Sequence, residues 1–289
     1  MPKTLASGFL IGALVLPVLA FAQIEARRVA ADTRLLDPQA QAWETAPVVT
    51  VALLPQVVTT PRHASIAVTE LKVRALHDGR RIAFHLEWKD ATKSDRIVVD
   101  QFGDQVAVEL PVKFDKEKLP SPMMGNPGAR VDIWQWRAVF QRDIDAEQHA
   151  RGSHLHAQHQ LRELYPNAVI DLYPDEVLRA TDARPYTGAL GLDNPVSHPL
   201  ATPVLDQSAE GWGTMTVEVD GQDADGKGIW RDGVWRVVIT HPIASDSEND
   251  IQLAPGAESV TAFAVWDGGN REVGSRKSWS NWLPLKLQE

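Results

Sequence analysis

The sequence predicts a mainly β protein, an antiparallel β-sandwich with a few short helices and long inserted loops. Strict alternation of apolar and polar residues, which buries one face of a strand, runs through "ELKVRAL" (70–76) and "RIAFHLEW" (81–88). Asp232-Gly233, between two apolar runs, is the pair favoured in tight hairpin turns. Segments with helical periodicity are few, which favours two packed sheets over a helical fold.

Taken in order, the apolar patterns predict further strands at 47–54, 105–112, 131–140, 214–219, 234–240 and 259–266. The best helix candidate is 145–165, interrupted by Gly152. The segment 166–211 is rich in Pro, Gly, Asp and Asn and shows little periodicity, which is typical of an insertion that wraps a core or meets a partner. We therefore expect one domain over 23–289, with an insertion at about 140–210.

The first residues, "MPKTLASGFLIGALVLPVLAFAQ", have the pattern of a secretory signal peptide. A basic start at Lys3 precedes an apolar run that ends in small residues at Ala20 and Ala22. A membrane anchor is the competing interpretation, but a span needs about 20 uninterrupted apolar residues, and Pro17 interrupts this run. We expect a signal peptide over 1–22, cleavage after Ala22 and export of the chain, with no membrane span in the mature protein.

Composition excludes several kinds of function. The chain of 289 residues has no cysteine, so disulfides, thiolate metal sites, iron–sulfur clusters and covalent c-type haem are ruled out. Any cofactor must be held without a covalent bond, by His, Met, Lys, Tyr or carboxylate. The formal net charge of −9 opposes binding to nucleic acid.

Two polar segments resemble metal sites only superficially. Histidines gather at 149, 154, 156 and 159, but their spacing matches no closed zinc site, and a solvated polar face explains them better. The acidic loop "DGQDADGKG" (220–228) has Lys227 where a calcium loop needs its fifth-position ligand and Val234 where it needs the bidentate carboxylate. We interpret it as a hydrophilic connection.

Catalytic motifs are either absent from the sequence or cannot be recognised from sequence alone. The chain has no Gly-x-Ser-x-Gly elbow and no thiol nucleophile. Paired carboxylates for glycoside hydrolysis meet only in the fold, so the sequence leaves them open. Ten tryptophans make a carbohydrate-binding module a genuine alternative, although filling the sandwich core is the more ordinary role for each of them.

Two adjacent methionines stand out in "PSPMMGNPGARVDIWQW" (120–136), in a Pro/Gly loop before a predicted strand. Methionine fills gaps in cores, and it also offers a soft thioether to a metal, as in the axial ligation of haem iron. Prolines at 120, 122 and 127 stiffen the loop and lower the entropy cost of holding a ligand. The residues alone leave both roles open.

Three blocks, in order, resemble the haem b-binding γ subunits of the type II dimethyl sulfoxide reductase family. They are "PMMGNPGARVDIWQWRA" (122–138), "GIWRDGVWRVVITHPI" (228–243) and "FAVWDGGNREVGSRKSWSNW" (263–282). The family includes the small subunits of ethylbenzene dehydrogenase, dimethyl sulfide dehydrogenase and the selenate, chlorate and perchlorate-type reductases. The likeness runs from "LDPQAQAWETAPVVTVAL" (36–53) to the C-terminal end and is poorest at 140–210.

The resemblance implies a β-sandwich that holds one non-covalent b-type haem between a methionine and a lysine. The methionine corresponds to Met124, with Met123 as the fallback, and the lysine to Lys277. Lysine binds iron only as the free amine, so Lys277 must be held largely out of water. From spacing alone, Lys277 would pass for a surface cation. Trp134, Trp136 and Arg137 are expected to line the haem or neutralise its propionates.

The resemblance further implies a periplasmic electron-transfer subunit with no catalytic site of its own. Its partners would be a molybdenum-containing catalytic α subunit, an iron–sulfur β subunit and a soluble cytochrome-type carrier, for which an acidic surface suits a basic partner. Two alternatives stay open. One is a carbohydrate-binding β-sandwich, and the other is a stand-alone haem protein of the DOMON-like kind.

Overall fold

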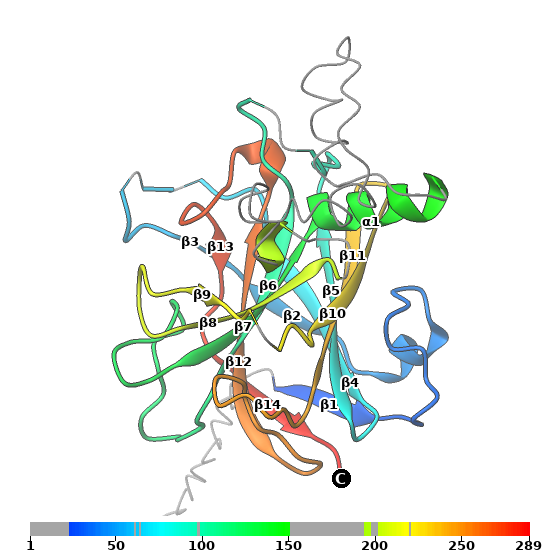
Figure 1. The fold of residues 1–289 in the computed structure, drawn as a ribbon, viewed down its shortest axis with the longest axis vertical. Coiled ribbons are helices and arrows are strands. Elements are labelled where there is room, and N and C mark those ends of the chain that lie inside the picture. The colour runs from blue at the N-terminus through cyan, green and yellow to red at the C-terminus, as the bar shows by residue number, and fades with distance from the viewer. Residues whose placement is uncertain are drawn as a thin grey trace, which may run out of the picture.

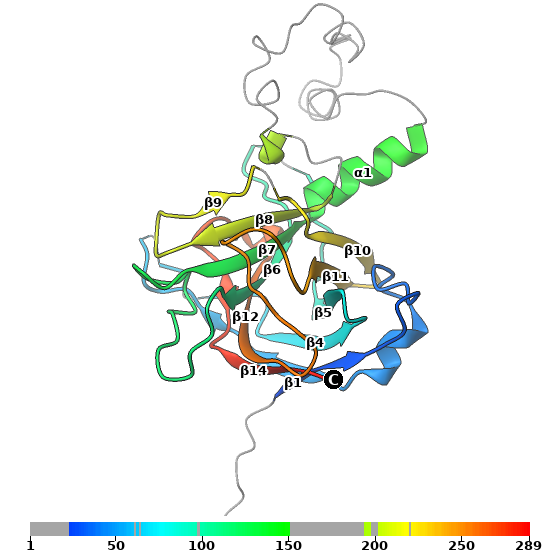
Figure 2. The same cartoon turned by 60° about the horizontal axis from the view of Figure 1, so that its bottom comes forward.

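The protein is described by a computed structural model that covers residues 23–60, 62–63, 65–96, 99–150, 194–197, 202–219 and 221–289, with side chains omitted at 146–150. A single hydrogen-bonded path of strands folds over on itself to form two facing layers (Figures 1 and 2). The predicted signal peptide lies outside the described residues.

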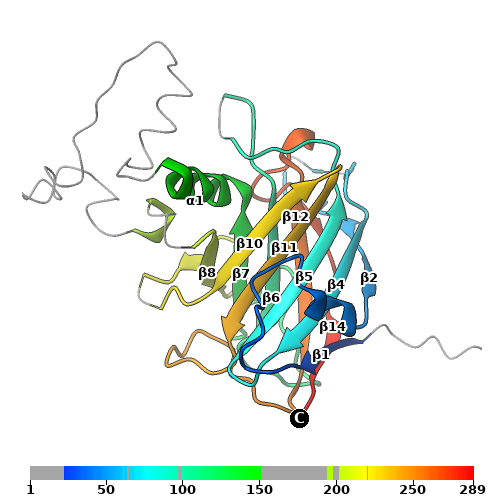
Figure 3. The same ribbon diagram turned by 90° about the vertical axis from the view of Figure 1, so that its right-hand side faces the viewer.

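The first layer has its strands side by side in Figure 3. Its order is β10 (Asp225–Arg231), β11 (Val234–Pro242), β5 (Arg81–Lys89), β4 (Glu70–His77), β1 (Ile24–Arg28) and β14 (Leu283–Leu287), with β2 (Val49–Ala52) also on β4. Neighbours are antiparallel except β1, which is parallel to both β4 and β14. Asp232 and Gly233 turn β10 into β11 with positive φ at both residues, as the hairpin prediction requires.

The second layer has the order β12 (Glu258–Trp266), β6 (Gln105–Pro111), β7 (Val131–Arg137), β8 (Val204–Ala209) and β9 (Thr216–Val217). Two short strands extend it beyond β12, namely β13 (Ser278–Trp279) and β3 (Leu54–Pro55). The first residues of β12 pair with β14 and the later ones with β6. That strand therefore joins the two layers.

Helical structure is confined to the edges. The one described α-helix, α1 (Ala138–Ala150), follows β7 and contacts β7 and β10 at one end of the sandwich (Figure 3). Short 3₁₀ turns are η1 (Gln41–Thr45), η4 (Pro195–Ser197) and η5 (Gly268–Asn270). Among the described residues, no helix is long and apolar enough to cross a membrane.

The core lies between the layers and is rich in aromatic rings. Phe84 of the first layer contacts Trp134 and Phe263 of the second, with ring centroids 6.2 and 6.1 Å apart. Trp136 meets Trp235 edge to face at 5.0 Å. Six of the ten tryptophans are buried, and four of these lie in the core between the layers, so the prediction that most tryptophans fill the sandwich core is only partly confirmed: Trp88, Trp134, Trp136 and Trp235. Trp43 and Trp266 belong to smaller apolar clusters outside that core.

The predicted fold class is confirmed, and most predicted strands lie within a residue or two of their observed bounds. The strand prediction at 131–140 was wrong at its end, because Ala138 already begins α1. The strands β1, β8 and β14 were not predicted. All six residues of β8 are buried, so its sequence shows no alternation to detect.

The predicted helix at 145–165 overlaps α1 only at 145–150, and the rest of it lies outside the described residues. His154, His156 and His159 lie there too, as do 151–193 of the predicted insertion. One domain over 23–289 with an insertion at about 140–210 therefore stays a prediction.

Candidate functional site

The face of the second layer that points away from the core carries an unusual set of residues, and we call it the outer face. Because strand residues alternate, those between the core positions of β6, β7, β8 and β12 share this face. A second, smaller apolar cluster lies on it, formed by Ala107, Val131, Ile133, Ala209 and Trp266, with Met124, Ala264 and Trp282 packed against them. Small alanines on neighbouring strands leave the backbone open to approach by a flat group.

The loop between β6 and β7 presents Met124 to this cluster. Met124 has φ +71°, a left-handed conformation that residues with a Cβ rarely adopt. The Gly211 N–H donates to the Met124 carbonyl at 2.7 Å, and the Gly125 N–H donates to the Ser121 carbonyl at 2.9 Å. Such strain concentrates at functional sites, where the surroundings over-determine the backbone.

Glycine is required next to Met124. A Cβ on Gly125, whose φ is +70°, would lie 2.7 Å from the Ala129 carbonyl oxygen and 3.0 Å from that of Ala209. The Met-Gly step is therefore fixed by both conformation and space, and it orients the Met124 side chain toward the outer face. Met123 has a different role, since its carbonyl accepts a hydrogen bond from Trp212 Nε1 at 3.1 Å.

Lys277 reaches the same cluster from the segment just before β13. Its carbonyl accepts a hydrogen bond from the Gln56 N–H, and its Nζ lies 5.0 Å from the centre of the Trp266 ring. Although the residue as a whole is half-buried, desolvation of the amine lowers the pKa of Lys277, and the charge of Glu109 opposes that shift. Met124 and Lys277, more than 150 positions apart in sequence, thus both reach the same apolar cluster, Met124 by packing against it and Lys277 through the Trp266 ring.

Glu109 of β6 interacts with both Met124 and Lys277. Burial raises the pKa of its carboxyl to about 7, against the charge of Lys277 and a hydrogen bond from the Met124 backbone. Its Oε1 has no hydrogen-bond partner among the described residues. The lysine and the carboxyl therefore share a poorly hydrated environment in which either neutral form is accessible.

Arg137, at the end of β7, is a half-buried cation without an anionic partner among the described residues, and its Nε atom is fully buried. Its Nη2 donates to Gln135 Oε1 at 3.2 Å, and its guanidinium lies 5.3 Å from the centre of the Phe140 ring. Nε has no partner, and burial lowers the pKa of Arg137 to about 10. An unpaired buried guanidinium is costly, and it fits the carboxylate of a bound group.

Three glutamines form a ladder across the outer face beside Arg137. Gln135 Nε2 donates to Gln105 Oε1 at 2.7 Å, and Gln207 Nε2 donates to Gln135 Oε1 at 3.0 Å. Sequence reasoning missed these residues and Glu109. The alternation of β6, with Gln105, Ala107 and Glu109 between valines and a leucine, was the available signal.

The structure does not bring Trp134 and Trp136 to the outer face. Both are fully buried in the core, on the opposite side of β7. Trp134 stacks on His241 with centroids 4.4 Å apart, and Trp136 packs on Trp235. A group held between Met124 and Lys277 would be separated from these two indoles by the sheet, so of the three residues expected to line it, only Arg137 lies on its side.

Fold and site together define a β-sandwich protein whose outer face gathers a thioether, a desolvated amine and an unpaired guanidinium. The chain belongs to the ethylbenzene dehydrogenase family, whose model matches residues 40–278. This match confirms the resemblance to the γ subunits of type II dimethyl sulfoxide reductases.

Two curated relatives cover most of the chain. A protein of Haloferax mediterranei, named as a respiratory nitrate reductase heme subunit (ORF7), is 24% identical over 262 residues, which cover 90% of this chain and 71% of the relative. The chlorate reductase subunit gamma of Ideonella dechloratans is 26% identical over 256 residues, which cover 86% of this chain and 79% of the relative.

Among solved structures, a carbohydrate binding module of family 9 from Caldicellulosiruptor kristjanssonii, in complex with cellotriose, is similar along most of its length. Sequence identity is 11%, the TM-score is 0.42, and the match covers 92% of this chain and 94% of that one. A similarity at this level carries no inference about ligands.

Proposed function

We propose that this chain is the electron-transfer subunit of a molybdenum oxidoreductase and that it carries one non-covalent b-type haem on its outer face. The observation that carries the proposal is the convergence of Met124 and Lys277 on the apolar cluster of the outer face, from loops far apart in sequence. The names of two relatives, a nitrate reductase heme subunit and a chlorate reductase gamma subunit, support the same function.

The residues present fit a haem in three respects. The Met124 thioether and the Lys277 amine are a pair of neutral donors suited to the two axial positions of the iron. Arg137 supplies an unpaired buried guanidinium for a propionate. The alanines and Ile133 give the apolar, sterically open surface on which a porphyrin ring packs.

With both axial positions filled, a haem iron exchanges single electrons and offers no open position to a substrate, so we propose no catalytic site on this chain. The contribution of the protein is to hold the Met124 thioether and the Lys277 amine in place as neutral donors. Desolvation favours the neutral amine of Lys277, and the charge of Glu109 opposes that shift.

Between the two methionines, we propose Met124 as the axial ligand. Its side chain packs against the apolar cluster of the outer face, and its backbone is held in the left-handed conformation by Gly211 and Glu109. The Met123 carbonyl is anchored to Trp212 instead. Met123 remains the fallback.

We further propose that the chain works in the periplasm, between an iron–sulfur β subunit and a soluble cytochrome-type carrier, with a molybdenum-containing α subunit as the catalytic partner. Support comes from the signal-peptide pattern of residues 1–22 and from the family. The net charge of −9 suits rapid encounter with a basic carrier.

The first experiment is to export the full chain from cells supplied with haem and to record its absorption spectrum. We expect a Soret band at one haem per chain that shifts in both Met124→Ala and Lys277→Ala. Matched controls are Met123→Ala and Lys286→Ala, the latter an exposed lysine on β14. Both controls should keep the parent spectrum.

A colourless chain would refute the proposal and favour the carbohydrate-binding alternative. A Soret band that is unaltered in both ligand variants would refute the ligand assignment. A red chain that purifies alone from its native host, without two larger subunits, would favour the stand-alone haem protein.

A further inference from the structure

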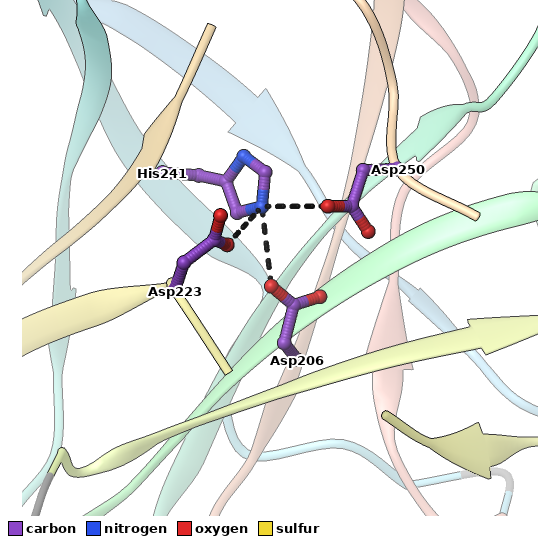
Figure 4. A group of neighbouring side chains, drawn as sticks. All are labelled: Asp206, Asp223, His241 and Asp250. Carbon is purple, nitrogen blue, oxygen red and sulfur yellow. Dashed lines mark ion pairs between the residues drawn. The ribbon is translucent and has the colours of Figure 1, made fainter. Parts of the chain in front are cut away.

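A buried acidic cluster lies between the two layers, on the side of the second layer opposite the outer face. Figure 4 shows three carboxylates pointing at the Nε2 atom of His241, from β8, from the loop before β10 and from the loop after β11. The distances from Nε2 are 3.1 Å to Asp206 Oδ2, 2.9 Å to Asp223 Oδ1 and 3.8 Å to Asp250 Oδ2. We call these four residues the inner cluster.

The imidazole of His241 is fixed by its surroundings. Its Nδ1 lies 2.7 Å from the Pro242 carbonyl oxygen, and because a carbonyl can only accept, Nδ1 carries a proton. The ring is fully buried and stacks on Trp134 with an angle of 8° between the planes. Metal-bound histidines are typically oriented in this way, with one nitrogen donating to a carbonyl and the other free for the metal.

The atom that faces the carboxylates has no hydrogen bond. Nε2 is within 3.1 Å of two carboxylate oxygens, yet no pair meets the geometry of a hydrogen bond, and Asp206 Oδ1, Asp206 Oδ2 and Asp250 Oδ2 have none either. Buried polar atoms are nearly always hydrogen-bonded, so a cluster of unpartnered ones points to a missing ligand. Here three carboxylates meet one imidazole nitrogen at ion-pair distance, and the four donor atoms lie close enough together to bind a single ion.

The charge of this region allows a divalent cation in place of a proton on His241, whose pKa the surrounding carboxylates raise to about 10 against the effect of burial. Asp132, fully buried on β7, adds a fourth carboxylate whose Oδ1 is also unpartnered, while its Oδ2 accepts a hydrogen bond from the Ile251 N–H. The nearby cation is Arg81, which donates to the Asp223 carbonyl at 2.8 Å. A protonated His241 and Arg81 together would leave two negative charges uncompensated, whereas a divalent cation with neutral His241 leaves one.

The spacing of the donors fits a small metal ion. At donor–metal distances of about 2.0–2.2 Å, the donors of a tetrahedral site lie about 3.3–3.6 Å apart. The three distances from Nε2 bracket that separation, and the four donor atoms all lie within 4.8 Å of one another. One imidazole with carboxylates is a donor set that suits first-row divalent ions better than Ca²⁺ or Mg²⁺, which prefer oxygen alone.

We propose that the inner cluster binds one divalent cation of the first transition row, with Zn²⁺ and Mn²⁺ as its representatives, through Asp206, Asp223, His241 and Asp250. The cation would link β8 in the second layer to β11 in the first, at the end of the core where charge replaces apolar packing. Its role is structural. Asp223 belongs to the loop that the sequence suggested was only a hydrophilic connection.

A second acidic group does not carry the same inference. Asp90, Asp104 and Asp267 also lie close together and are buried. However, the carboxylate of Asp104 already accepts hydrogen bonds from the Ser94 N–H, the Trp235 Nε1–H and the Gly268 N–H, at 2.7 to 2.9 Å. Backbone and indole N–H groups of the protein therefore already satisfy the carboxylate of Asp104.

The test uses the full chain, treated with chelator and then titrated separately with Zn²⁺ and with Mn²⁺. We expect one of these ions to bind at one equivalent per chain, counted by elemental analysis apart from iron, and to raise Tm by about 5 °C or more at saturation. Asp223→Asn should weaken binding at least about tenfold. Asp223 is the variant of choice because its side chain is 35% exposed, so the fold tolerates the change best.

Asp246→Asn is the matched control, since Asp246 is an exposed residue of the same loop as Asp250 and should leave binding unchanged. If Asp223→Asn fails to fold, the ¹⁵N shift of His241 Nε2 in the parent chain decides, because a bound metal and a bound proton give different shifts. An imidazolium signal that neither ion alters, or a Tm response that is equal in the parent and Asp223→Asn, would overturn the proposal.

Discussion

At the scale of single residues, the outer face is a set of groups that are costly on their own. Arg137 is a half-buried cation without a counter-ion among the described residues, Lys277 is an amine held out of water, and Met124 has a strained backbone. Each of these unfavourable features is explained if its interaction with a bound group offsets the free-energy cost. Stability and haem binding should therefore respond in opposite directions to the same substitution.

Arg137→Gln tests this opposition. Removing the buried charge should leave the haem-free chain at least as stable as the parent, while haem affinity falls about tenfold to a hundredfold, the worth of a charge-assisted hydrogen bond of about 1.5–3 kcal/mol. Haem titration and calorimetry of the haem-free chain measure the two effects. Arg130→Gln is the control, because Arg130 is paired with Glu210 and lies away from the outer face. Unchanged haem affinity in Arg137→Gln would exclude a propionate contact.

At the scale of elements, the loop between β6 and β7 determines the orientation of Met124. It is built from short hydrogen bonds within the loop and to the segment after β8 rather than from apolar packing. Two of its glycines have nearly the same φ, +70° at Gly125 and +77° at Gly128, but very different space around the missing Cβ. Alanine substitutions at these two glycines therefore separate the cost of the left-handed backbone conformation from the cost of a steric clash of the added Cβ.

Gly125→Ala should destabilise the chain by about 2–4 kcal/mol, because a left-handed alanine costs about 1 kcal/mol and the collision with two carbonyl oxygens adds more. Gly128→Ala, where nothing lies within 4 Å, should cost about 1 kcal/mol. Urea denaturation measures both. The Soret band should move only in Gly125→Ala, and equal effects of the two variants would show that the loop does not aim the ligand.

At the scale of the whole molecule, one sheet separates two charged regions. The outer face of the second layer carries the proposed haem ligands, and its inner face carries Trp134, on which His241 of the first layer stacks. Two further buried imidazoles, His77 and His85, bear on how the fold responds to acid. Burial lowers the pKa of His85 and of His77, with nearby arginine charges acting in the same direction.

The two buried imidazoles should make a contribution to the stability of the haem-free chain that is lost as the pH falls below about 6.5. Because the folded-state pKa of His85 is lowered from 6.5, the unfolded chain binds a proton in this range that the folded chain does not. The contribution is fully present above that pH. Between pH 7.5 and 5, the urea midpoint of His85→Gln should move less in the destabilising direction than that of the parent, and the midpoint of His85→Gln combined with His77→Gln less still. A slope equal to that of the parent in the double variant would contradict this assignment.

Much of the fold was predictable because alternation is a local property. The pattern Ile82, Phe84, Leu86 and Trp88 was expected to face one side, and all four lie in the core. The loop around Met124 and the segment before Lys277 were recognisable as sequence blocks. In contrast, β8 has no alternation, and the side of β7 occupied by Trp134 was assigned by proximity in sequence, which does not distinguish the two faces of a strand.

The sequence by itself determined the strand pattern, the absence of thiol chemistry, the family and the two residues proposed to hold a haem. Only the tertiary structure decided which groups meet. It placed Glu109 between Met124 and Lys277, turned Trp134 and Trp136 away from them, left Arg137 unpaired, and brought Asp206, Asp223 and Asp250 to His241. The physical reason is that alternation and local motifs depend on residues close together in sequence. Strand register determines which side chains are neighbours in a sheet, and it is set by pairing between segments far apart in sequence.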